Sequence, residues 1–155
     1  MNTRQLLEKI EQKIKPLVRY ANVLPYDKFL LLNCTILPKP IALIVNTRPS
    51  DHSGSHWFSL IITEYNEIYY FNSLRCSPRI CQSLFRKLNT MNMSIYYMKC
   101  RIQSEYSKAC GVFCLVFLMH MLLYKDFTKF TSLFHCHKYV YNETLAMKLY
   151  HEYFD

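Results

Sequence analysis

The sequence predicts an α+β fold, in which a small mixed sheet is surrounded by helices and one helix is buried at the centre. Short runs of β-branched and aromatic residues predict strands, and they are interspersed with segments of helical periodicity. The most apolar of these segments, Cys110 to Tyr124, has no obvious polar face, so we expect it to lie centrally. A length of 155 residues suits a single compact domain over residues 1–155.

The first half of the chain contributes one helix and three strands. Apolar residues between Thr3 and Tyr20 recur at helical spacing, which predicts a helix that ends near Pro16 or shortly after. The stretch from Asn22 to Pro40 contains three prolines and predicts mostly loop, with a short extended piece at Phe29 to Leu32. Strands are expected at Ile41 to Val45, Trp57 to Thr63 and Ile68 to Phe71, and the last two form a hairpin.

The second half adds helices and one further strand. Pro78 is suitably placed to begin a helix that continues to Leu88. A fourth strand is expected at Ser94 to Met98, and the central helix starts at Cys110. Asn142 is the expected cap of a last helix that runs from Glu143 to Phe154.

Composition limits the classes of protein that need consideration. Hydrophobic residues make up 51% and charged residues 19%, which argues against disorder. No apolar run reaches the ~18 residues that a membrane span requires, so we expect no membrane partner. The charged, amphipathic start is not a secretory signal. With seven cysteines, an odd number, we therefore expect a reducing environment and mostly free thiols.

The chain is basic, with a formal charge of +8 and a pI of about 9.1. Such a charge favours polyanionic partners, especially nucleic acid. The lysines and arginines are scattered and form no basic tail, so a generic solvated surface explains the charge as well as a dedicated DNA site does.

The chain has only two glycines, whereas an average usage of about 7% would give roughly eleven. Gly111 directly follows Cys110, and Gly54 lies two residues before His56. We expect both glycines at positions where a side chain would obstruct something.

Cys110 is a candidate nucleophile because it stands at the start of the central helix. A helix N-terminus stabilises an anion and lowers the pKa of a thiol. Gly111 would let a substrate backbone approach the sulfur. The alternative is a buried structural cysteine beside a helix-start glycine, as we expect for Cys114 one turn further on.

His56 is the candidate base, since it opens the strand that begins at Trp57 and lies at the rim of the sheet. Neutral imidazole can take a thiol proton and form a thiolate–imidazolium pair. Trp57 can stabilise the imidazolium through a cation–π contact as well as fill the core. The alternative is a strand-end histidine without a role.

Two further residues fit the same chemistry. Asn72 ends the strand that pairs with the His56 strand, so the two residues should be neighbours and the amide oxygen can orient the imidazole. Gln103 precedes Cys110 by seven residues, and its side-chain N–H₂ can join the Cys110 backbone N–H as an oxyanion donor. Taken alone, they read as a turn asparagine and a polar loop residue.

Together these motifs resemble adenain, the adenovirus-type endopeptidase family. The resemblance rests on Gly-x-His-Trp, an Asx residue sixteen positions after the histidine, and Gln-x₆-Cys-Gly. It also includes YDKF at Tyr26 to Phe29, IVNT at Ile44 to Thr47 and SKACGVFC at Ser107 to Cys114. It extends over about residues 26–120.

The resemblance implies a circularly permuted papain-like site, with catalytic His56, Asn72, Gln103 and Cys110, and substrate contacts at Gly54, Trp57 and Gly111. It implies cleavage of viral capsid and core precursor proteins within the virion or the host nucleus. No cofactor or metal is needed for this chemistry, although DNA and a short peptide act as activators in the adenovirus enzymes. We expect a monomer.

The sequence also departs from the family. Asn72 stands where the family usually has an acidic residue, and Ser73-Leu74-Arg75 replaces Pro-Phe-Gly. Cys100 is near in sequence to the cysteine that bonds the peptide activator, but it is out of register. The chain is also shorter than the adenovirus enzymes, with a different C-terminal part.

Three other functions fit parts of the sequence. A peptidase for ubiquitin-like modifiers would share the permuted site. A non-enzymatic DNA-binding protein would use the +8 charge and the 15% of aromatic residues. A metal site would draw on Cys136 with His135 and His137, or on Cys76 and Cys81, although neither spacing is a usual structural zinc pattern.

Overall fold

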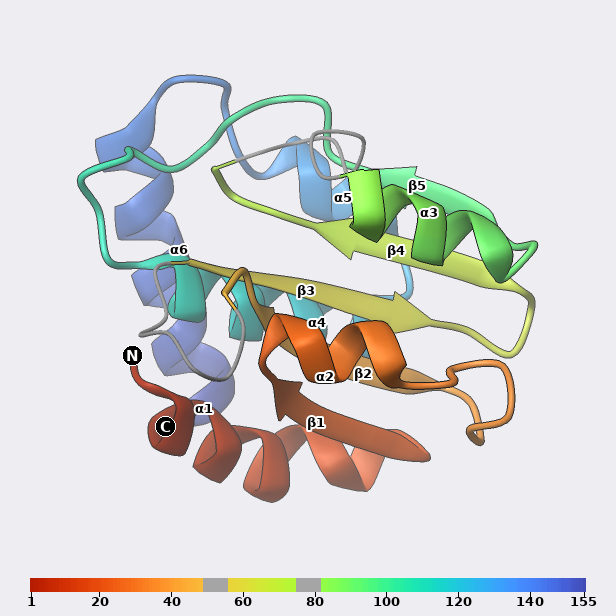
Figure 1. Cartoon of the computed structure of the whole chain (residues 1–155). Helices are drawn as coiled ribbons and strands as arrows, with labels where there is room; N and C mark the ends of the chain where they lie inside the picture. Colours follow the sequence, from red (N-terminus) through yellow and green to blue (C-terminus); the bar gives the residue numbers. More distant parts are fainter. Residues whose placement is uncertain (49–55, 75–81) are drawn as a thin grey trace.

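The computed structural model describes residues 1–48, 56–74 and 82–155, which have the predicted α+β fold (Figure 1). Within these residues, five strands form one sheet in the order β1-β2-β3-β4-β5. The outer pairs, β1 with β2 and β4 with β5, are parallel, and the inner pairs are antiparallel. The strands are β1 (Tyr20–Leu24), β2 (Ile41–Asn46), β3 (Trp57–Ile62), β4 (Glu67–Phe71) and β5 (Ser94–Tyr97).

Helices cover both faces of the sheet. In Figure 1, α2 (Tyr26–Leu31) and α3 (Gln82–Thr90) lie in front of the sheet, and α4 (Cys110–Tyr124) runs behind it. Successive side chains of a strand point to opposite faces of the sheet, so the sheet divides the core into two clusters. Along β2, Ala42 and Ile44 belong to the cluster around α4, whereas Leu43 and Val45 belong to the cluster beneath α2 and α3. The remaining α-helices are α1 (Thr3–Lys9), α5 (Phe127–Ser132) and α6 (Tyr139–Phe154).

The central helix is buried, as the sequence predicts. Every residue of α4 from Cys110 to Met121 is buried. The Phe117 ring stacks on Phe71 of β4, with centroids 5.0 Å apart, and meets Phe130 of α5 at 5.2 Å. Because apolar neighbours enclose α4 on several sides, the helix needs no polar stripe. Its first residue is therefore held rigidly against the sheet.

The N-terminal third differs from the prediction. Helical structure does run to residue 17, because α1 continues into a π-helical turn (Ile10–Ile14) and a 3₁₀ turn (Lys15–Leu17). The expected loop after it contains strand β1, which pairs in parallel with β2. The extended piece predicted at Phe29 to Leu32 is wrong, since most of it lies in the short helix α2, which buries Phe29. The partners of both elements are distant in sequence, so local patterns did not reveal them.

The C-terminal part also differs. Helix α5 was not predicted; Asp126 caps it by accepting a hydrogen bond from the Lys129 N–H at 2.8 Å. Helix α6 begins at Tyr139, so Asn142 lies inside it and is not its cap. The buried Asn142 side chain instead donates to the carbonyl oxygens of Ile102 and His135, at 3.0 and 2.7 Å. The predicted helix start at Pro78 lies outside the described residues.

Cys100 and Cys136 form a disulfide, so the expectation of mostly free thiols fails for this pair. Cys34, Cys110 and Cys114 are free and buried, and Cys76 and Cys81 lie outside the described residues. Within the part of the chain that the structure describes, no helix has the length and apolarity that a membrane crossing demands.

Candidate active site

The β3–β4 hairpin brings His56 and Asn72 together, as the antiparallel pairing predicts. Ser59 lies opposite Phe71, so the start of β3 adjoins the end of β4. The imidazole Nε2 of His56 lies 2.7 Å from the Oδ1 of Asn72, and both side chains are less than a tenth exposed. A buried polar pair of this kind is held in one geometry by its hydrogen bond.

The neighbours of Asn72 determine which His56 nitrogen carries the proton. The Leu74 N–H donates to Asn72 Oδ1 at 3.1 Å, and Asn72 Nδ2 lies 3.1 Å from the Tyr70 hydroxyl. Because a backbone N–H only donates, the atom that faces both Leu74 and His56 must be the oxygen. His56 Nε2 therefore donates, and Nδ1 holds the basic lone pair of the neutral ring.

Cys110 is the first residue of α4. Burial raises the pKa of its thiol above the ordinary 9.0, whereas the nearby backbone N–H groups of Trp57, Gly111 and Cys110 act to lower that pKa. The prediction of a lowered thiol pKa is therefore wrong, because burial outweighs the helix N-terminus. The sulfur therefore lies near Trp57, which directly follows His56 in the chain. A buried thiol of raised pKa needs such a base to become a nucleophile.

Gln103 lies on the segment between β5 and α4, beside the end of β4. The backbone N–H groups of Ile102 and Gln103 both donate to the Ser73 carbonyl oxygen at 3.1 Å. The Gln103 side chain is fully buried, accepts from the Ser73 hydroxyl at 2.5 Å and donates from Nε2 to the Ser107 carbonyl oxygen at 3.0 Å. The structure thus places a fixed amide donor on the segment that leads into Cys110.

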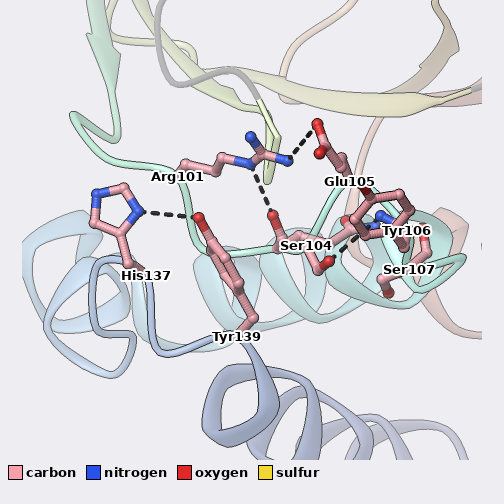
Figure 2. Close-up of polar contacts among 8 residues, drawn as sticks. Arg101, Ser104, Glu105, Tyr106, Ser107, His137 and Tyr139 are labelled. Atoms are coloured by element: carbon pink, nitrogen blue, oxygen red, sulfur yellow. Dashed lines mark hydrogen bonds and ion pairs between the residues drawn. The ribbon is translucent and has the colours of Figure 1, made fainter.

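Polar contacts hold this segment in place (Figure 2). The Arg101 Nε donates to the Gln103 carbonyl oxygen at 3.0 Å, and the guanidinium lies 3.6 Å from the Glu105 carboxylate and over the Tyr139 ring. The His137 N–H donates to the Arg101 carbonyl oxygen at 3.2 Å. Together with the adjacent disulfide, these contacts attach the Gln103 segment to the start of α6.

The predicted substrate contacts have different surroundings. Trp57 is buried beside Cys110 in the cluster around α4. A Cβ atom on Gly111 would lie 3.2 Å from Met1 Cβ and 3.3 Å from Leu6 Cδ2, so close packing of the N-terminal segment gives this glycine a structural reason. Its role in substrate access stays a prediction, and Gly54 lies outside the described residues.

Ser73 is a site residue that the sequence interpretation did not select. Its only sequence signal is its position directly after Asn72. Among the described residues, no group of three His, Cys, Asp or Glu side chains is arranged to hold a metal ion. Cys136, one ligand of the alternative metal site, is bonded to Cys100.

Comparison with known proteins identifies the fold. No family model matches the chain, and no curated protein matches it in sequence. The Chlamydia trachomatis effector protein ChlaDUB1 shares 18% identity with a TM-score of 0.52, over 74% of this chain and 55% of that chain. The two proteins share the α+β fold of a mixed sheet with helices.

Another solved structure covers nearly the whole length. The central domain of the uncharacterized Lpg1148 protein from Legionella pneumophila aligns with a TM-score of 0.55 at 11% identity, over 98% of this chain and 94% of that chain. The chain therefore spans just over half of ChlaDUB1, and it corresponds to almost the entire Lpg1148 domain.

Proposed function

We propose that the chain is a cysteine endopeptidase whose nucleophile is Cys110 and whose general base is His56. The observation that carries this proposal is the buried His56–Asn72 hydrogen bond close to Cys110, which packs in the same cluster as Trp57, the residue after His56. The tautomer assigned above gives Nδ1 the basic lone pair, and the start of α4 supplies backbone donors.

The reaction proceeds by acyl transfer. His56 Nδ1 takes the Cys110 thiol proton, and the thiolate attacks the scissile carbonyl carbon. The Cys110 N–H and the Gln103 amide stabilise the oxyanion. The imidazolium then protonates the departing amine, and a water molecule, deprotonated by the same nitrogen, releases the acyl group. Asn72 keeps the ring in the tautomer that these proton transfers require.

For the substrate we propose viral precursor proteins, cleaved after short motifs that contain glycine. The support is the similarity to adenain at YDKF, IVNT and SKACGVFC, which extends beyond the catalytic residues. The same similarity supports action in the virion and host nucleus, with DNA or a short peptide as activator. Cys100 is engaged with Cys136 in this structure, so a peptide activator bound through Cys100 would first require that disulfide to open.

Labelling with a thiol-directed electrophile, followed by mass spectrometry, tests the catalytic pair. We expect selective modification of Cys110 near neutral pH in the native chain. His56→Ala should lose this labelling and regain it only above pH 9.0, because burial raises the pKa of the isolated thiol.

Cys110→Ala should abolish cleavage with the fold intact. Cys34→Ala is the matched control, since Cys34 lies in the cluster on the opposite face of the sheet. An active Cys110→Ala protein contradicts the proposal.

Cleavage assays distinguish the substrates. Capsid precursor cleavage supports the viral assignment, whereas preferential cleavage of a Gly-Gly ubiquitin-like conjugate supports the second peptidase class. DNA binding that is insensitive to Cys110→Ala, without any proteolysis, supports the non-enzymatic alternative.

A further inference from the structure

We propose that Ser73 is a positioning residue of the active site. Its hydroxyl fixes the Gln103 amide so that one N–H remains directed to the substrate oxyanion. This inference rests on the proposed peptidase function and assigns to Ser73 a role that it performs through Gln103.

The first observation is that Gln103 is bonded at each of its polar atoms. Its N–H donates to the Ser73 carbonyl oxygen, and its own carbonyl oxygen accepts from the Arg101 Nε. The side-chain Oε1 accepts from Ser73 Oγ and Nε2 donates to Ser107. Ser73 is 1% exposed and Gln103 is fully buried. Water therefore cannot substitute for a lost partner without rearrangement.

The chemistry of the partners fixes the orientation of the amide. The Ser107 carbonyl oxygen can only accept, so Nε2 must face it. The Oε1 atom then faces Ser73, and because an amide oxygen also only accepts, the Ser73 hydroxyl must donate its single proton. Nε2 has two hydrogens, and one of them is committed to Ser107. Within the described part of the chain, the second hydrogen has no acceptor.

Ser73 also joins the two halves of the site. Its carbonyl oxygen accepts from both Ile102 and Gln103, so the oxyanion segment is bonded to the residue that directly follows Asn72. Asn72 in turn orients His56. The base and the oxyanion donor are thus set by adjacent residues at the end of β4, which keeps their separation constant through the reaction.

Removing the Ser73 hydroxyl leaves Oε1 of Gln103 buried without a donor, which favours rotation of the amide away from its catalytic position. We expect Ser73→Ala to lower kcat by roughly 10- to 10²-fold with little change in KM, a smaller effect than the roughly 10²- to 10³-fold loss when an oxyanion donor is removed. Alkylation of Cys110 by iodoacetamide should be unchanged, because that reaction forms no oxyanion.

The test measures kcat and KM for a cleaved peptide with the native chain, Ser73→Ala, Gln103→Ala and the double variant. A positioning role predicts that Ser73→Ala has no further effect once Gln103 is absent. A purely structural role predicts that the two losses multiply. Ser104→Ala is the matched control, because its hydroxyl lies on the same segment and accepts from the Tyr106 N–H (Figure 2).

Native kcat in Ser73→Ala, or losses that multiply in the double variant, overturn the inference. If Ser73→Ala does not fold, Ser73→Cys takes its place, since a thiol keeps nearly the same shape and donates only weakly. A kcat of Ser73→Cys equal to that of the native chain would likewise overturn the inference. A native chain without proteolysis or selective Cys110 labelling instead contradicts the proposed function itself, which separates the two failures.

Discussion

At the scale of single residues, Asn72 sets the character of the proposed site. An amide oxygen accepts the imidazole proton but adds no negative charge, unlike a carboxylate. Its partners, the Leu74 N–H and the Tyr70 hydroxyl, hold it in one orientation. Asn72 can therefore orient the imidazole ring, but it adds no charge that would stabilise an imidazolium.

Asn72→Asp should keep this geometry, because both carboxylate oxygens accept and the Tyr70 hydroxyl can turn to donate. The added charge stabilises the imidazolium and so raises the pKa of the base. We therefore expect the acidic limb of the kcat/KM profile, below which His56 is protonated and cannot accept the thiol proton, to move to higher pH. Asn72→Ala should lower kcat, since it removes the amide oxygen that accepts from Nε2 of His56. Coincident pH profiles for the native chain and Asn72→Asp would show that Asn72 does not act on the base.

Gln103→Ala should reduce turnover by roughly 10²- to 10³-fold, because it removes one of two proposed oxyanion donors. The variant should have a lower kcat, and its Cys110 should be alkylated at the same rate as in the native chain. Steady-state kinetics with a peptide substrate measures the effect. Turnover within about twofold of the native value would remove Gln103 from the oxyanion site.

At the scale of elements, the connection between β5 and α4 determines the position of the proposed oxyanion donor. It carries Gln103, and it is anchored to the start of α6 by the Cys100–Cys136 disulfide and by the buried Asn142. Asn142 contacts the Ile102 carbonyl oxygen directly beside Gln103. An irregular segment thereby gains the rigidity that an oxyanion donor needs.

Replacing Cys100 and Cys136 together by alanine should lower the free energy of unfolding by about 3–4 kcal/mol, as expected for a cross-link that closes a loop of this length. The two cysteines are 36 residues apart. Urea denaturation measures the change, and Cys34→Ala serves as a single-cysteine comparison. Addition of a reductant should destabilise the native chain and leave the double variant unaffected. Equal stability with and without reductant would show that the disulfide does not form in solution.

At the scale of the whole molecule, two core clusters on opposite faces of the sheet hold the site. Helix α4, behind the sheet, carries the proposed nucleophile, and the β3–β4 hairpin holds the proposed base. The net charge of +8 is a property of the entire surface. It bears on partners, because long-range electrostatics acts on association with polyanions rather than on the fold.

If DNA is a partner, binding should be strongly salt-dependent, since released counterions drive it. For a site that neutralises several phosphates, affinity should fall by roughly 10³-fold or more between 50 and 200 mM salt. Fluorescence anisotropy of a labelled duplex with Cys110→Ala measures binding without proteolysis. Affinity that does not change with salt, or no binding at low salt, would exclude a DNA site of this kind.

The sequence by itself determined the elements whose signal is local. The apolar run of α4 predicted its bounds, Cys110–Tyr124, because a helix buried along most of its length requires continuous hydrophobicity. The β3–β4 hairpin followed from adjacent strands and a short turn, and it placed His56 beside Asn72. The types and spacing of these residues with Gln103 and Cys110 predicted the chemistry that we propose.

Only the tertiary structure decided the rest. Strand β1 and helix α2 depend on partners far along the chain, so their local sequence predicts loop and, at Phe29 to Leu32, an extended piece. The Ser73–Gln103 hydrogen bond joins residues 30 positions apart, and the disulfide joins residues 36 apart. The raised thiol pKa of Cys110 likewise comes from burial, which depends on what covers the sulfur. Sequence periodicity records which face of an element is buried, whereas hydrogen-bond partners and desolvation are set by the packing of distant segments.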